Sequence, residues 1–202
     1  MTEEIKAVIF DWGGVMIDDP GPGLMKYCAE KFKVTEDLFD KTFHKFLEYF
    51  QTNSVSDDKF WELICRELKK DKPSEVSLWK DAFRAVYKPR EEMFSLADSL
   101  QKRDYKTAVL SNTELPALDF FIEQRYNCFD AQVFSCKEGV TKPNKKIYEI
   151  TVKKLDCTPR QAVFIDDKKP MAEGAKNAGL NAILFESINQ VKKELIKFGL
   201  DL

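Results

Sequence analysis

The sequence predicts an α/β fold: a doubly wound parallel sheet with an all-helical cap inserted after the first strand. Two observations lead to this prediction. Short apolar runs alternate with helical segments over the C-terminal half, and a purely helical stretch, residues 24–87, separates them from one further apolar run near the N-terminus. The 202 residues are 44% hydrophobic, which is enough for one domain with an insertion. We therefore expect residues 1–18 and 90–202 to form the core and residues 19–89 the cap.

The first predicted strand is the apolar run at residues 7–10, which ends at Asp11 and a glycine pair. A carboxylate is thus placed where a buried strand emerges into a flexible turn. Two segments, residues 19–23 and 88–90, lie where the pattern changes and are poor in helix-compatible residues. We expect them to be the hinges between core and cap.

The predicted cap helices are marked by apolar and aromatic side chains at helical spacing, over residues 38–50 and 60–68. Thr35 and Ser56 are expected to cap these two helices, because their hydroxyls can accept hydrogen bonds from the free amides of the first turn. A further helix is predicted to start at Pro73-Ser74. The cap is therefore expected to be a small helical bundle.

The remaining strands of the predicted sheet are short apolar runs, each separated from the next by one helical segment. Two helix starts between or after these runs are also predicted. One is at Thr158-Pro159, where a cap precedes a proline, and one is at Ser187, which forms a capping-box pattern with Gln190. The runs are residues 107–110, 131–134, 162–165 and 181–185.

Polar side chains follow three of the predicted strands, at the edge of the sheet where ligands of such folds bind. Asp11 follows the first, Ser111-Asn112-Thr113 the second and Asp166-Asp167 the fourth, while Lys142 precedes a helix. Each group alone is more typical of a cap, a turn or a solvated surface. The combination favours a different interpretation, because three carboxylates at one edge repel one another unless a cation binds among them. Mg²⁺ is a hard cation that takes oxygen ligands and suits a phosphate site.

Four segments in order resemble the motifs of one family: "VIFDWGGV", "VLSNT", "GVTKPNKKIY" and "VFIDD". The sequence resembles the haloacid dehalogenase-like hydrolase superfamily, in particular its phosphatase branch with a helical cap after the first strand. The resemblance covers residues 5–18 and about 92–186, whereas the cap is similar only in position and helical character. It implies a Rossmann-like core and Mg²⁺-dependent hydrolysis of a small phosphorylated metabolite.

The resemblance implies a role for each polar group. Asp11 would be the nucleophile that forms an aspartyl-phosphate. Ser111 and the amide of Asn112 would bind the phosphoryl oxygens, and Lys142 would neutralise charge on the transferring group. The metal ligands would be Asp11, the carbonyl oxygen of Gly13, Asp166 and Asp167, with Asp167 favoured for direct contact.

Gly13 departs from the family pattern, in which an aspartate at this position protonates the leaving group. Loss of such a group typically lowers the rate by roughly 10²–10⁴. We expect a slower enzyme, a preference for good leaving groups, or a proton relay through Asp18, Asp19 or His44. Asp18 and Asp19 are more typical of a hinge role, and His44 of a surface position. Lys168 or Lys169 could attract an anionic substrate, although solvated surface lysines are more typical here.

The composition limits the kinds of binding partner and the cellular location that we expect. The chain carries 32 basic and 34 acidic residues without a long run of one sign, which indicates neither nucleic-acid nor membrane binding. The five cysteines are odd in number and widely spaced, so reduced thiols are expected. The N-terminus lacks an apolar signal segment, and a cytoplasmic location is expected. The substrate and the oligomeric state are not predicted.

Two alternative functions remain open at this stage. A 2-haloacid dehalogenase would use the same aspartate against carbon, and a halide leaves without a proton, but the Asp166-Asp167 pair argues against this reading. A binding or regulatory protein would keep the fold and turn over poorly or not at all, and Gly13 favours it. Retention of Asp11, Ser111 and Lys142 favours the phosphatase.

Overall fold

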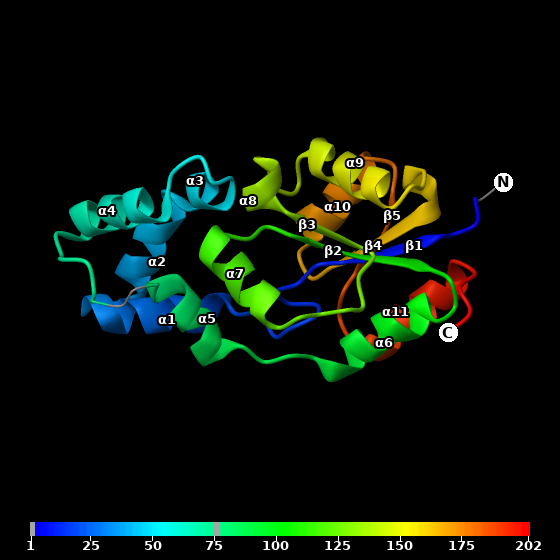
Figure 1. Cartoon of the computed structure of the whole chain (residues 1–202), viewed down its shortest axis with the longest axis horizontal. Helices are drawn as coiled ribbons and strands as arrows, with labels where there is room; N and C mark the ends of the chain where they lie inside the picture. Colours follow the sequence, from blue (N-terminus) through cyan, green and yellow to red (C-terminus); the bar gives the residue numbers. More distant parts are fainter. Residues whose placement is uncertain (1–2, 75–76) are drawn as a thin grey trace.

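The computed structural model describes residues 3–74 and 77–202. Its centre is a five-stranded parallel sheet in the order β3-β2-β1-β4-β5 (Figure 1), and this confirms the predicted fold class. The two central registers align Phe10 of β1 with Val109 of β2 and Ile165 of β4, so these strands end at the same edge. The strands are Ala7–Phe10 (β1), Lys106–Ser111 (β2), Ala131–Phe134 (β3), Ala162–Asp166 (β4) and Asn181–Leu184 (β5).

Helices cover both faces of the sheet, and every residue of β1 is buried. Val8 and Phe10 pack in one apolar cluster with α6, α7 and α11, whereas Ala7 and Ile9 pack in a second cluster with α9 and α10. Strands buried on both faces read as continuous apolar runs, which is why the sequence revealed them. These helices and the short α8 are Glu91–Gln101 (α6), Leu115–Glu123 (α7), Ser135–Glu138 (α8), Lys145–Lys154 (α9), Lys169–Asn177 (α10) and Ile188–Lys197 (α11).

The five helices that the structure describes between β1 and α6 form the cap, which lies at one end of the molecule beside the carboxyl ends of the strands (Figure 1). The predicted caps of two of them are confirmed: the Thr35 and Ser56 hydroxyls accept from the amides of Leu38 and Lys59. The cap helices are Gly21–Phe32 (α1), Glu36–His44 (α2), Leu47–Gln51 (α3), Asp57–Leu68 (α4) and Leu78–Val86 (α5).

Three predicted boundaries differ from the structure. The segment expected to be a hinge contains the first turn of α1, since Pro22 occupies a position where its missing N–H costs nothing. Helix α5 starts at Leu78, so the start predicted at Pro73-Ser74 is wrong; residues 75–76 lie outside the described residues. The helix expected at Thr158-Pro159 is a single 3₁₀ turn, Pro159–Gln161 (η1), because β4 begins at Ala162.

The glycine at position 23 has a packing reason. A Cβ on Gly23 would lie 2.7 Å from Cγ1 of Val86, so helices α1 and α5 meet here at a distance that only glycine allows. Gly23, which contributed to the prediction of a hinge at residues 19–23, is therefore needed for close packing of two helices.

The two chain segments that join core and cap are paired with each other. The Asp18 amide donates to the Lys88 carbonyl oxygen, and the Arg90 amide donates to that of Met16, both at 2.9 Å. The Asp18 carboxylate also forms ion pairs with Lys88 and Arg90, each at 3.0 Å. Asp18 is thus a residue of this junction.

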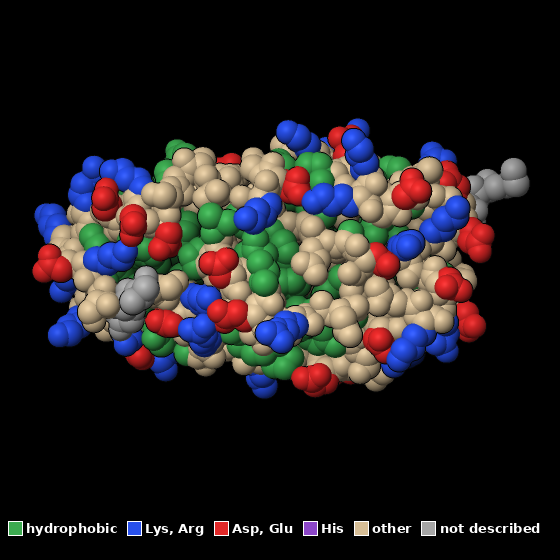
Figure 2. All heavy atoms as spheres, in the orientation of Figure 1, with side chains coloured by type: hydrophobic (Ala, Val, Ile, Leu, Met, Phe, Trp, Pro, Cys, Tyr) green, Lys and Arg blue, Asp and Glu red, His purple; other side chains and the backbone are tan. Residues whose placement is uncertain are grey.

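The surface in Figure 2 carries lysine and arginine interspersed with aspartate and glutamate, and no large area of this face has a single sign. This agrees with the near-zero net charge of −2. Within residues 3–74 and 77–202, no helix is long and apolar enough to cross a membrane.

Candidate active site

Asp11 lies directly after β1, at the carboxyl edge of the sheet. Its amide donates to the Ile165 carbonyl oxygen (2.9 Å), which continues the β1–β4 pairing to this residue. The Trp12 amide donates to Asp11 Oδ1 at 2.7 Å, and the side chain is buried. Its orientation is therefore set by the strand and the turn that follows.

Lys142 lies in the loop before α9 and is buried between two carboxylates. Its Nζ is 2.8 Å from Asp11 Oδ1 and 2.7 Å from Asp166 Oδ2, and it donates to the Leu110 carbonyl oxygen at 3.1 Å. Burial lowers the pKa of Lys142, but the two carboxylates outweigh this effect and raise it. A buried ammonium with three acceptors is satisfied, so Lys142 remains charged.

The pKa of Asp11 is raised to about 6, because burial disfavours the charged carboxylate. The positive charge of Lys142 opposes this rise, and the nearby Asp166 adds to it. Perturbed carboxyl groups of this kind concentrate at functional sites. A further positive charge beside Asp11 would therefore lower its pKa and favour the ionised carboxylate.

Asp11, Asp166 and Asp167 each offer a carboxylate oxygen, and these oxygens lie within 4.8 Å of one another. Asp166 has both oxygens engaged, one by Lys142 Nζ and the other by the Lys168 amide at 2.8 Å. Asp167 Oδ1 is buried and has no hydrogen-bond partner among the residues that the structure describes. An orphaned buried carboxylate oxygen beside two further acids fits a hard cation such as Mg²⁺.

Gly14 leaves room for the Asp167 side chain. A Cβ at this position would lie 2.4 Å from both Cγ and Oδ2 of Asp167, and Gly14 has φ +90°, which disfavours other residues. Arg90 Nη1 donates to the Gly14 carbonyl oxygen at 2.6 Å and fixes this turn from the other side. The second glycine of the first motif, Gly14, thus accommodates the Asp167 side chain of the fourth motif.

Ser111 and Asn112 follow β2 at the same edge. Ser111 Oγ accepts from the Thr113 hydroxyl at 2.8 Å. The Asn112 side chain pairs with the backbone of Lys142: Nδ2 donates to its carbonyl oxygen (3.0 Å), and Oδ1 accepts from its amide (2.8 Å). This clamp, which sequence reasoning missed, positions the buried lysine. The predicted phosphoryl contacts of both residues stay predictions.

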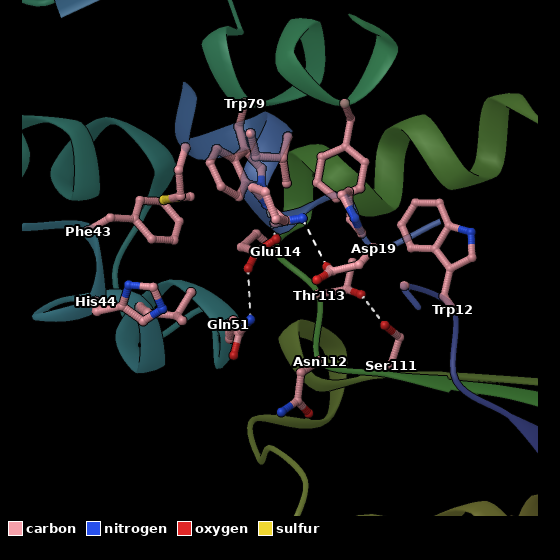
Figure 3. A pocket seen from close by; sticks show the side chains of 18 of the residues that line it. Trp12, Asp19, Phe43, His44, Gln51, Trp79, Ser111, Asn112, Thr113 and Glu114 are labelled. Carbon is pink, nitrogen blue, oxygen red and sulfur yellow. Dashed lines mark hydrogen bonds between the residues drawn. The ribbon is translucent and has the colours of Figure 1, made fainter. Parts of the chain in front are cut away.

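A cavity of about 660 Å³ lies between this edge and the cap (Figure 3). Asp11, Gly13, Ser111, Asn112 and Lys142 line its core side, so the structure brings these predicted site residues together. Asp166 is fully buried. The cap contributes an apolar wall that includes Phe43, Trp79 and Phe83.

Three proposed relay residues separate in the structure. Asp19 and His44 line the cavity, whereas Asp18 lies in the ion pairs of the junction. Helix α2 carries His44 on its exposed side, where Nδ1 lies 3.3 Å from Asp40 Oδ1. Lys168 also lines the cavity.

Glu114 is a site residue that sequence reasoning missed. It directly follows the Ser-Asn-Thr segment and lines the cavity with only 4% of its surface exposed. Gln51 Nε2 and Trp79 Nε1, both from the cap, donate to its two oxygens at 2.9 Å each (Figure 3). Burial raises the pKa of Glu114, and these two hydrogen bonds oppose the rise. An acid directly after "SNT" was the available signal.

Several known proteins are similar to this chain in sequence. Mouse acyl-CoA dehydrogenase family member 10 is 26% identical over 94% of this chain, which spans 19% of that protein's length. Sesquiterpene phosphatase astK of Aspergillus oryzae is 24% identical, with 89% of each chain covered. Glyceraldehyde 3-phosphate phosphatase of Methanothermobacter thermautotrophicus is 24% identical over 98% of this chain and 93% of its own.

Solved structures share the fold. The HAD family enzyme bt-2542 of Bacteroides thetaiotaomicron, in complex with magnesium and inorganic phosphate, has a TM-score of 0.75 at 18% identity and covers 93% of this chain and 98% of its own. L-2-haloacid dehalogenase of Xanthobacter autotrophicus has a TM-score of 0.63 at 22% identity, covering 96% and 83%. An enzyme crystallised with magnesium and phosphate and a dehalogenase share this fold, so the fold does not choose between phosphatase and dehalogenase activity.

The family assignment rests on a match to the family as a whole and not on any one of these likenesses. Residues 5–179, which contain all four motifs and the cap, match the haloacid dehalogenase-like hydrolases. The chain therefore belongs to the haloacid dehalogenase-like hydrolase family.

Proposed function

We propose that this protein is a Mg²⁺-dependent phosphatase that hydrolyses a small phosphate monoester through an aspartyl-phosphate on Asp11. The observation that carries the proposal is the charge arrangement around Asp11: one buried lysine contacts two carboxylates, and a third carboxylate has an orphaned oxygen. A dianionic phosphoryl group and a divalent cation are the two partners that complement this set. Two phosphatases among the relatives support the same reading.

In the proposed first step the Asp11 carboxylate attacks phosphorus, the bond from phosphorus to the leaving oxygen breaks, and an acyl phosphate forms on Asp11. The Trp12 amide and Lys142 Nζ hold the attacking carboxylate. Lys142 and the donors of Ser111 and Asn112 stabilise the charge on the transferring oxygens. Water then attacks phosphorus, which releases phosphate and restores Asp11.

The proposed metal ligands are Asp11, Asp167 and the Gly13 carbonyl oxygen. Mg²⁺ bound there would neutralise charge on the phosphoryl oxygens. Both oxygens of Asp166 already accept hydrogen bonds, so Asp166 would not contact the metal but would position Lys142 and the Lys168 amide. Asp167 is thus our choice for direct contact.

The test is a panel of aryl, acyl and alkyl phosphates with Mg²⁺, assayed with the natural protein and with Asp11→Asn. We expect Mg²⁺-dependent phosphate release that Asp11→Asn abolishes. Asp98→Asn is the matched control, because it makes the same chemical change on the exposed face of α6. Release that survives Asp11→Asn would contradict the proposal.

Two other outcomes would identify the alternatives. Mg²⁺-independent release of halide from 2-haloacids would identify a dehalogenase, although the carboxylate of such a substrate would enter a cavity that holds Asp11 and Glu114. Mg²⁺ binding without any phosphate release would identify the binding protein that Gly13 favours.

A further inference from the structure

We propose that Glu114 forms a specificity subsite, which selects phosphate esters whose leaving group carries a hydrogen-bond donor, an ammonium group best of all. This inference rests on the proposed phosphatase function, because it names the substrate class of the same cavity. Glu114 is a residue of the core, yet its carboxylate faces the cap side of the cavity, where the leaving group of a phosphate held at Asp11 would lie.

The first argument is the hydrogen-bond capacity of the Glu114 carboxylate. An ionised carboxylate has about four acceptor sites on its two oxygens. Gln51 Nε2 and Trp79 Nε1 use one on each oxygen, both at 2.9 Å. Both partners donate, which requires acceptor oxygens on Glu114. Acceptor capacity therefore remains at a residue that lines the cavity.

The second argument is the charge balance. Neither of the two groups that donate to Glu114 is a cation, and Lys168 acts on it only at longer range. A buried carboxylate without an ion pair is costly. A ligand ammonium in the cavity would supply the missing charge, and a ligand carboxylate would add to the repulsion.

The third argument is the wall around this carboxylate. Phe43 and Trp79 stack with ring centroids 4.6 Å apart, and Phe83 lies edge-on to Trp79 at 6.0 Å. All three line the same cavity as Glu114. Aromatic faces attract cations, and they pack equally well on the carbon skeleton of an amino alcohol or an aminomethyl ring.

The test uses four aryl phosphates that differ only in the group para to the phosphate: aminomethyl, hydroxymethyl, methyl and carboxymethyl. The methylene insulates the ring, so the four leaving groups have similar acidity and differ in what they offer Glu114. We expect kcat/KM to fall in that order, with the aminomethyl ester ahead of the methyl ester by about tenfold or more. Equal rates, or a preference for the carboxymethyl ester, would overturn the inference.

Two variants separate the charge of Glu114 from its contact with the cap. Glu114→Gln should bring the aminomethyl-to-methyl ratio close to one. Trp79→Phe removes the indole donor but keeps the carboxylate, and it should preserve the preference. The ratio is measured within each protein, so a general loss of activity cancels. An unchanged ratio in Glu114→Gln, or an equal collapse in Trp79→Phe, would show that Glu114 only holds the cap, against the inference.

A binding measurement keeps this test separate from the proposed function. The corresponding phenols, titrated against intrinsic tryptophan fluorescence, report on the subsite without turnover. Tighter binding of 4-(aminomethyl)phenol than of 4-methylphenol that Glu114→Gln abolishes would support the subsite even if no ester were hydrolysed. Hydrolysis of all four esters without a preference would leave the phosphatase proposal standing and end this one.

Discussion

At the scale of single residues, the site is held by buried charges that satisfy one another. Lys142 joins Asp11 to Asp166 and is fixed by the Asn112 side chain through its own backbone. Removing one member leaves its partner buried and unpaired, which is costlier than the pair itself. Asp167 Oδ1, which has no hydrogen-bond partner among the described residues, is where we propose that a metal binds.

Gly14→Ala should weaken Mg²⁺ binding by roughly 10- to 100-fold, the range for changes that displace a ligand's supporting contacts. The new methyl group would lie 2.4 Å from the Asp167 carboxyl, which must move. The measurement is the Mg²⁺ concentration for half-maximal turnover. Gly139→Ala is the matched control, because Gly139 also has a positive φ but no atom within 4 Å of the added methyl group. Equal Mg²⁺ requirements in both variants would refute this role of Gly14.

Gly13 leads to a prediction about leaving groups. Without an acid at this position, the rate should fall steeply as the pKa of the leaving alcohol rises. Gly13→Asp should restore alkyl phosphate hydrolysis by up to roughly 10²-fold, the lower bound for a general acid, and flatten that trend. The added Cβ would lie 3.2 Å from Pro20 Cδ, a tight contact that a small shift relieves.

The control for this prediction is Gly13→Asn, which has the same shape and cannot donate an acid proton. Kinetics on a series of aryl and alkyl phosphates provide the measurement. Equal rates for aryl and alkyl esters in the natural protein would contradict the prediction, as would an equal gain in Gly13→Asn.

At the scale of elements, the cap is organised around aromatic side chains. Phe50 of α3 stacks on Phe60 of α4 with ring centroids 3.9 Å apart, and Phe43 of α2 lies edge-on to Phe60 at 5.3 Å. Phe43 in turn stacks on Trp79 of α5, whose indole N–H reaches Glu114 in the core. The aromatic core of the cap therefore positions a donor in the cavity.

Phe60→Ala should lower the free energy of unfolding by about 3–5 kcal/mol, because Phe60 is fully buried among other rings. Tyr49→Ala is the control: Tyr49 is 53% exposed, and its loss should change stability by roughly 0.5 kcal/mol or less. Urea unfolding of the two variants measures the difference. Equal effects would show that the cap does not depend on this cluster.

The link between Glu114 and the cap should respond to pH. Its folded pKa is raised above the ordinary value of 4.5, so the folded state favours the protonated form. This contribution is complete below the unfolded pKa and is lost as pH rises through the folded pKa. The stability of the natural protein relative to Glu114→Gln should therefore decrease with rising pH above about 4.5. A difference that stays constant with pH would contradict the raised pKa.

The elements differ in how well sequence predicts them. The strands were located to within a residue or so, because strands buried on both faces are short apolar runs. The start of α1 was missed because Pro22 and Gly23 are typical of a loop. Gly23 is instead needed for close contact with Val86, which is distant in sequence. Glu114 was missed for the same reason: its partners Gln51 and Trp79 are 63 and 35 residues away.

At the scale of the whole molecule, the cavity exists because the cap covers the carboxyl edge of the sheet. The core supplies Asp11 after β1, Lys142 from the loop before α9, and Asp166 and Asp167 at the end of β4. Strand order places the three acids at one edge of the sheet. The cap supplies the aromatic wall and the donors to Glu114. In the proposed function, the core therefore positions the reacting groups, and the contact between core and cap selects the substrate.

The central claim, a phosphoryl group carried by Asp11, has a direct measurement. The protein is mixed with Mg²⁺ and an aryl phosphate, quenched in acid during turnover, and digested for mass spectrometry. We predict a phosphate on the peptide that contains Asp11, absent from Asp11→Asn. Turnover without phosphorylated protein, or with phosphate on another residue, would contradict the account.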